Sequence, residues 1–106
     1  MKQEIETAIL DFRSKIKEAK QNPLLENLAA YERLIADNIE NGNLATGKYH
    51  AELLVEFYID ENPYSPDEES EMARIKDSNP RLYQAMDAGR KAYHIGKAAQ
   101  SLIALL

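Results

Sequence analysis

Histidines and carboxylates are the side chains most able to do chemistry in this sequence, because it contains no cysteine. His50 is followed by Glu52 and Glu56, but residues two apart lie on different sides of a helix, so His50 and Glu52 cannot chelate one ion. Neither the Glu-x-x-His pattern of di-metal bundles nor His-Glu-x-x-His occurs. His94, between a tyrosine and an isoleucine, is interpreted as a partly buried or interface side chain. We therefore predict no metal site and no cofactor.

No arrangement typical of catalysis is complete either. Two carboxylate pairs lie in or beside a segment that we expect to be an exposed loop, namely Asp60/Glu61 and Glu68/Glu69. Gly42 and Gly47 flank a short segment that lacks the Lys-Ser/Thr ending of a phosphate-binding loop, and Gly-x-Ser-x-Gly does not occur. The sequence therefore predicts no catalytic residue and a protein that is not an enzyme.

The composition is that of one ordinary globular domain. The 106 residues are 44% hydrophobic and 29% charged, with a net charge of −5, which is enough chain to build a core without disulfides. No apolar run approaches the ~20 residues of a membrane span. The first residues are polar and acidic, unlike a secretory signal. We expect a single domain over residues 1–106, in the cytoplasm and away from membranes.

Apolar residues repeat at helical spacing in the first 40 residues. The spacing predicts a helix over residues 2–20, with the stripe Ile5, Ile9, Phe12, Ile16 and Ala19. A second helix is predicted over residues 23–40, with the stripe Leu24, Leu28, Tyr31, Ile35 and Ile39. Asn22-Pro23 separates the two helices, and Asn41-Gly42-Asn43 ends the second.

Residues 44–59 are ambiguous between helix and strand. The segment 53–59 is rich in β-branched and aromatic residues, as a buried strand would be. No partner strand is evident elsewhere, however, and Ala51, Leu54, Phe57 and Tyr58 fit one helical face. We therefore predict a helix.

Two further helices begin at a capping residue followed by proline. Ser65-Pro66 begins a short fourth helix with acids in its first turn, and Asn79-Pro80 begins a fifth that continues to Leu106. The predicted fold class is all-α, a compact bundle of about five helices. The first, second, third and fifth would form the core, and the fourth with its acidic loop would be a lid or protrusion.

Small residues line one face of the expected last helix. They are Ala85, Gly89, Ala92, Gly96 and Ala99. Each glycine costs a helix roughly 1 kcal/mol relative to alanine, so such a face is typical of a close approach by another backbone. The favoured interpretation is that the first helix packs there within the same chain. A groove for self-association or for a partner is one alternative, and a ligand pocket is another.

Charge is unevenly distributed along the chain. Residues 52–71 contain eight acids and no base, whereas residues 74–97 contain six bases and two acids. A solvated face explains the acids without any partner. The functional hypothesis is an acidic patch, with tyrosine anchors, that docks on a basic protein surface. The residues assigned to it are Glu52, Glu56, Tyr58, Asp60, Glu61, Tyr64, Asp67 and Glu68.

These features favour a small protein-binding module over other functions. We expect a stoichiometric inhibitor, immunity-like protein or adaptor, of a phage or bacterial accessory type, that acts by occlusion. One alternative is a homo-oligomeric structural or ligand-holding bundle that uses the small-residue face. Another is a nucleic-acid-binding protein, which the net acidic charge disfavours. Its phosphate contacts would be Arg90, Lys91 and Lys97, or Arg13, Lys15, Lys17 and Lys20.

Overall fold

The computed structural model describes residues 2–106, and every regular element within that range is a helix. Helix α1 spans Gln3–Ala19. The next segment combines η1 (Pro23–Leu25), α2 (Leu28–Tyr31), η2 (Glu32–Asp37) and α3 (Asn38–Glu40). Helix α4 (Leu44–Val55) continues into η3 (Glu56–Asp60), and η4 (Pro66–Glu68), α5 (Glu69–Ser78) and α6 (Pro80–Leu105) complete the chain. The helix predicted for residues 44–59 is confirmed.

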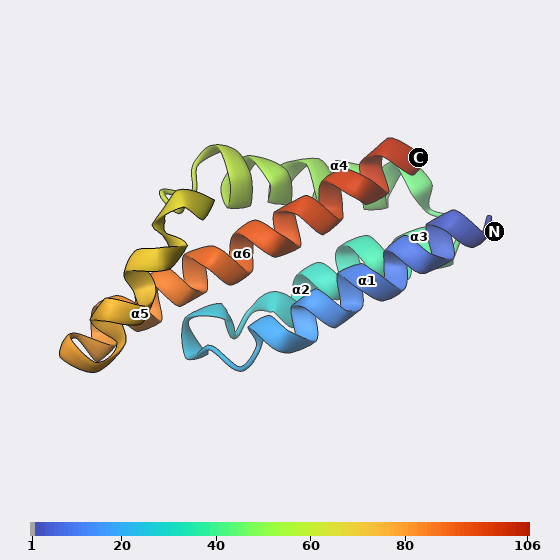
Figure 1. Cartoon of the computed structure of the whole chain (residues 1–106). Coiled ribbons are helices and arrows are strands. Elements are labelled where there is room, and N and C mark those ends of the chain that lie inside the picture. Colours follow the sequence, from blue (N-terminus) through green and yellow to red (C-terminus); the bar gives the residue numbers. More distant parts are fainter. Residues whose placement is uncertain (1) are drawn as a thin grey trace.

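Four long helical segments form a bundle in which each packs against two neighbours (Figure 1). Helix α6 packs between α1 and α4, and η2 closes the ring by contacting both α1 and α4. The two termini lie at one end, whereas α5 packs against the first part of α6 at the other end, beyond the turn after α1 (Figure 1). The predicted all-α bundle and its protruding fourth helix are confirmed. We call α5 and the first part of α6 the arm.

Local sequence signals explain where these helices begin. The Asn22 side chain accepts a hydrogen bond from the backbone N–H of Leu24, and the Asn79 side chain accepts one from the N–H of Leu82. Ser65 accepts similarly from Asp67 at the start of η4. In each case a proline follows the capping residue, because the first helical position needs no N–H donor.

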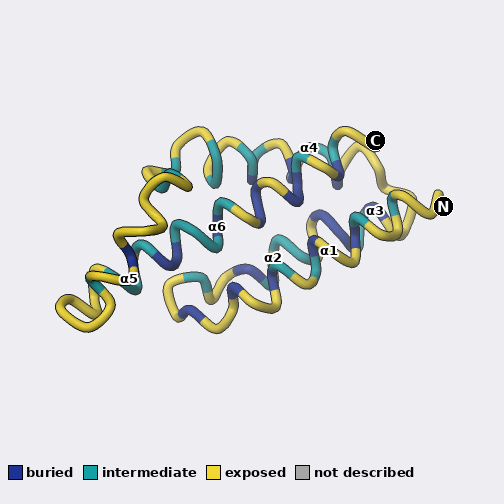
Figure 2. The backbone as a smooth tube through the Cα atoms, viewed as in Figure 1, coloured by how far each residue is buried: buried dark blue, intermediate teal, exposed yellow. Residues whose placement is uncertain are grey.

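The core lies along the axis of the bundle, where the buried sides of the helices face one another (Figure 2). The predicted stripe of α1 is confirmed, with Ile9, Phe12 and Ile16 fully buried. Two other predictions are wrong. Leu24 is 58% exposed because it lies in the separate η1 turn, and Phe57 is 52% exposed because η3 winds more widely than an α-helix.

The helix predicted over residues 23–40 is broken at residues 26–27: η1 precedes the break, and a continuous helical segment of α2, η2 and α3 follows it, with a π-helical turn at η2. A π turn bonds residue i to i+5 and so brings residues five apart onto one side. Glu32 and Asp37 are placed in this way, and each carboxylate lies 2.9 Å from the guanidinium of Arg13, with Glu40 at 3.0 Å. Burial lowers the pKa of Arg13, but hydrogen bonds to Asp37, Glu32 and Glu40 outweigh it and raise the pKa above its ordinary value.

Glycines allow the helices to approach closely at two places. A Cβ at Gly96 would lie 2.8 Å from the Ile59 side chain, and a Cβ at Gly47 would lie 2.6 Å from the side chain of Ile39 and 3.1 Å from the Ile35 carbonyl oxygen. The expectation that helix 1 occupies the small-residue face is therefore wrong at Gly96. The neighbour there is η3, which follows directly from α4 and lies alongside α6.

We predict that Gly47→Ala lowers the free energy of unfolding by about 1–2 kcal/mol, because overpacking outweighs the gain in helix propensity. Gly89→Ala is the comparison variant and should cost less, since its Cβ would lie 3.3 Å from its nearest atoms, in the side chains of Asn62 and Tyr64. Urea unfolding followed by circular dichroism measures both. Equal stability of Gly47→Ala and the wild type would contradict the close packing of α4 on η2 and α3.

Candidate functional site

The loop after η3 is fixed to α6 by the side chain of Asn62. Its amide nitrogen donates to the carbonyl oxygens of Tyr58 (3.0 Å) and Gly89 (2.9 Å). Its amide oxygen accepts a hydrogen bond from the backbone N–H of Tyr64 (3.0 Å). One side chain therefore holds both ends of the loop and joins them to α6. The sequence analysis missed Asn62, and the Asn-Pro pair at residues 62–63 is the one local signal of an ordered turn.

The small-residue face of α6 is divided between the core and the surface. Ala92, Gly96 and Ala99 are buried in the bundle, whereas Gly89 is half-buried and Ala85 is exposed. The exposed portion lies on the arm, beside the loop that Asn62 holds. Two predicted surfaces, the small-residue face and the acidic segment, therefore meet at this point.

A groove of about 330 Å³ lies where the loop and η4 meet α6. Most of its lining is apolar, and the α6 side consists of Leu82, Ala85, Met86 and Gly89. Pro63 and Tyr64 line the opposite side, and Glu68 supplies the acidic edge. A neighbouring hollow shares Met86 and Glu68 and adds Asp67 and Glu71. We call this the arm groove, an apolar surface with a carboxylate edge.

The two tyrosines assigned to the acidic patch lie in different environments. The Tyr58 ring packs against Tyr31 with centroids 6.0 Å apart, next to the core, and burial raises its pKa to about 12. The Tyr64 ring lies 5.5 Å from that of Tyr93 and lines the arm groove. Its pKa is raised by burial and by the negative charge of Glu69. Of these two tyrosines, only Tyr64 lines the groove.

The six acids assigned to the patch are exposed, and within residues 2–106 none has a basic group within 4.0 Å. They are Glu52, Glu56, Asp60, Glu61, Asp67 and Glu68. Glu52, Glu56 and Asp60 belong to α4 and η3 and do not line the arm groove, whereas Glu68 does. The remaining two acids of this segment are paired, Glu69 with Arg90 and Glu71 with Arg74.

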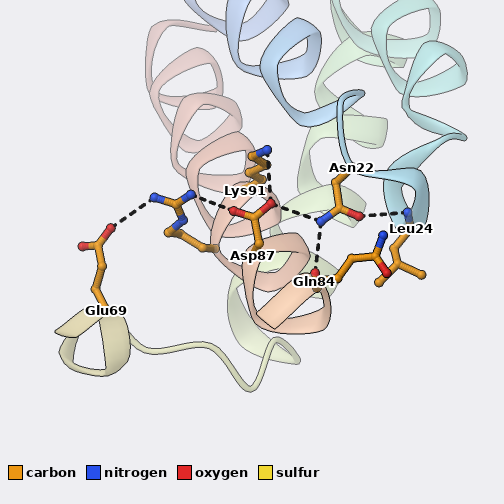
Figure 3. Close-up of polar contacts among 7 residues, drawn as sticks. Asn22, Leu24, Glu69, Gln84, Asp87 and Lys91 are labelled. Carbon is orange, nitrogen blue, oxygen red and sulfur yellow. Dashed lines mark hydrogen bonds and ion pairs between the residues drawn. The ribbon is translucent and has the colours of Figure 1, made fainter. Parts of the chain in front are cut away.

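A buried polar cluster joins the arm to the bundle (Figure 3). Asp87 accepts hydrogen bonds from Arg90 (2.7 Å) and Asn22 (3.2 Å) and pairs with Lys91 (3.1 Å). Asn22 also donates to the Gln84 carbonyl oxygen. Arg90 extends the cluster to Glu69, 3.5 Å away at the start of α5. Asp87, Arg90 and Lys91 are close in sequence, but their contacts with Asn22 and Glu69 join distant parts of the chain, so the cluster was not predicted.

The rest of the described chain adds no metal-binding chemistry. Within residues 2–106, no group of three or more His, Asp or Glu side chains is arranged to hold a metal ion. Over the same range, no helix is both long and apolar enough to cross a bilayer. No protein-family model, curated protein or solved structure matches the chain.

We predict that Asp87 makes stability depend on pH. Burial raises the pKa of Asp87, but hydrogen bonds from Arg90, Lys91 and Asn22 outweigh it and hold the pKa below the ordinary 3.8. A carboxylate whose folded pKa is lowered stabilises the fold above its ordinary pKa, and this contribution is lost as the pH falls through the folded value.

Asp87→Asn should therefore cost about 1–3 kcal/mol near neutral pH and less as the pH falls below 3.8. Urea unfolding at about pH 7 and about pH 3 measures this difference. Asp77→Asn is the matched control, because Asp77 is exposed and no ion pair involves it within residues 2–106. A cost for Asp87→Asn that is the same at both pH values would contradict the prediction.

We predict that Asn62→Ala releases the loop without unfolding the bundle, since Asn62 holds the loop to the surface of α6. Amide hydrogen exchange at Tyr64 should quicken by at least tenfold, because its N–H donates to the Asn62 side chain. Asn27→Ala is the control, because Asn27 precedes α2 but its side chain makes no capping hydrogen bond to that helix. Unchanged exchange at Tyr64 in Asn62→Ala would show that the loop is held by other contacts.

Proposed function

We propose that this protein is a small protein-binding module that covers a basic surface on a partner protein and acts by occlusion. The observation that carries the proposal is that six exposed acids of residues 52–68 have no ionic partner in the described chain. Such charges increase the rate of association with an oppositely charged surface and exclude acidic competitors. The proposal covers a stoichiometric inhibitor or an adaptor, and it places the protein in the cytoplasm.

The distribution of basic side chains supports an acidic rather than a basic recognition surface. Arg13 contacts three carboxylates, while Arg90 and Lys91 pair with Asp87. Lys97 lies over the ring of Tyr93, which is an intramolecular contact. Of the seven basic side chains that a nucleic-acid interface would use, five form ion pairs within the chain: Arg13, Lys15, Lys20, Arg90 and Lys91. Phosphate would have to displace these carboxylates, so the nucleic-acid hypothesis is less well supported.

The test compares two triple variants that remove the same charge from different surfaces. The patch variant is Glu61→Gln, Asp67→Asn and Glu68→Gln. The control variant is Glu6→Gln, Glu18→Gln and Glu26→Gln, at exposed positions without ion pairs in residues 2–106. Each tagged protein is used to capture partners from its cell of origin. The captured partner is then purified, and its affinity is measured by calorimetry at about 50 mM and about 500 mM salt.

We expect one stoichiometric partner that the wild type and the control variant bind equally. The patch variant should bind that partner at least tenfold more weakly, and the wild-type affinity should fall as the salt concentration rises. Equal affinity of the patch variant and the wild type, or an affinity independent of salt, would contradict the proposal. So would the recovery of no stoichiometric partner.

A further inference from the structure

The arm groove has the form of a surface that receives a helix. Leu82, Ala85, Met86 and Gly89 are spaced by three, one and three residues along α6, so they form one continuous stripe. Leu82 is 46% exposed and Ala85 is also exposed, so the stripe is open to solvent along part of its length. Grooves of this kind bind the apolar face of an amphipathic helix.

The charge at the edge of the groove defines the partner further. Asp67 and Glu68 lie at this edge, are exposed and form no ion pair in the described chain. An apolar side chain that enters the groove therefore lies next to uncompensated negative charge. A ligand with basic residues beside its apolar face would neutralise that charge, whereas an acidic or purely apolar ligand would not.

We propose that the arm groove binds a basic amphipathic helix of the partner, with apolar side chains against Leu82, Ala85 and Met86. Lysine or arginine side chains of that helix lie against Asp67 and Glu68. This inference rests on the proposed function and names the chemistry of the partner segment that the module recognises.

Charge also favours a basic partner helix over a second copy of this chain as the occupant of the arm groove. In a two-fold dimer the same surface faces itself, so Asp67 and Glu68 of one copy would approach the same acids of the other. The groove itself supplies no base to offset them, because none of its lining residues is lysine, arginine or histidine. A basic partner segment meets no such repulsion.

The test uses two synthetic peptides of the same leucine and lysine composition. In one, leucines recur every three or four residues and form one helical face. In the other, they are distributed around the helix. Binding of fluorescently labelled peptides is followed by anisotropy at about 50 mM salt. The protein variants are Leu82→Gln, Ala85→Trp to fill the groove, and Leu10→Gln as a matched control, since Leu10 is 67% exposed on α1. Circular dichroism verifies that each variant is folded.

We expect the amphipathic peptide to bind at least tenfold more tightly than the redistributed one. Leu82→Gln and Ala85→Trp should each weaken its binding about tenfold, and Leu10→Gln should leave it unchanged. Equal binding of the two peptides, equal effects of Leu82→Gln and Leu10→Gln, or no binding would overturn the inference.

Two further results separate the inference from the proposed function. In the first, the captured partner is lost with the acidic patch variant but retained by Leu82→Gln and Ala85→Trp. This result would support the proposed function and overturn the inference that the arm groove binds the partner. Light scattering that shows a dimer in the wild type and a monomer in Leu82→Gln would make a second copy the occupant, and this too would overturn the inference.

Discussion

The approach of residues 58–64 to the glycine positions of α6 is the constraint on which the rest of the molecule depends. At Gly96 the missing side chain leaves room for Ile59, and the core is closed there. About two helical turns earlier, the carbonyl oxygen of Gly89 accepts a hydrogen bond from the side chain of Asn62. That bond positions the loop that forms one side of the arm groove. Core packing and surface shape therefore both depend on one helix face: a larger side chain at Gly96 would meet Ile59, and one at Gly89 would meet Asn62 and Tyr64.

The partly buried charged side chains form ion pairs, whereas many exposed acidic side chains do not. Arg13 lies among three carboxylates, and Asp87 receives contacts from two bases and an amide. Each partly buried charge thus has several partners, which offsets the cost of removing it from water. These pairings use Arg13, Arg90 and Lys91, whereas the exposed acids of residues 52–68 remain without ionic partners in the described chain. The proposed recognition surface is therefore built from side chains whose charge is not neutralised by ion pairs within the described chain.

Most of the fold follows from local signals, whereas the site depends on contacts between distant residues. The apolar spacing of α1 and the capping residues Asn22, Ser65 and Asn79 predict where helices lie. The π turns could not be predicted, because apolar residues spaced for an α-helix of about 3.6 residues per turn do not reveal a wider turn. The wider turn at η3 leaves Phe57 exposed. The role of Asn62 depends on a residue 27 positions later, and the burial of Asp87 depends on one 65 positions earlier. No local pattern contains that information.

Both ends of the described chain lie at the end of the bundle opposite α5 (Figure 1), and the longest dimension of the molecule is 47 Å. The arm and the chain ends thus lie at opposite ends of the molecule. A solid support, a fluorescent dye or a fused domain joined at either end of the described chain lies with most of the bundle between it and the arm. The arm then faces away from the attachment point in both cases. Tethering of this protein therefore sets the orientation of the arm without covering it.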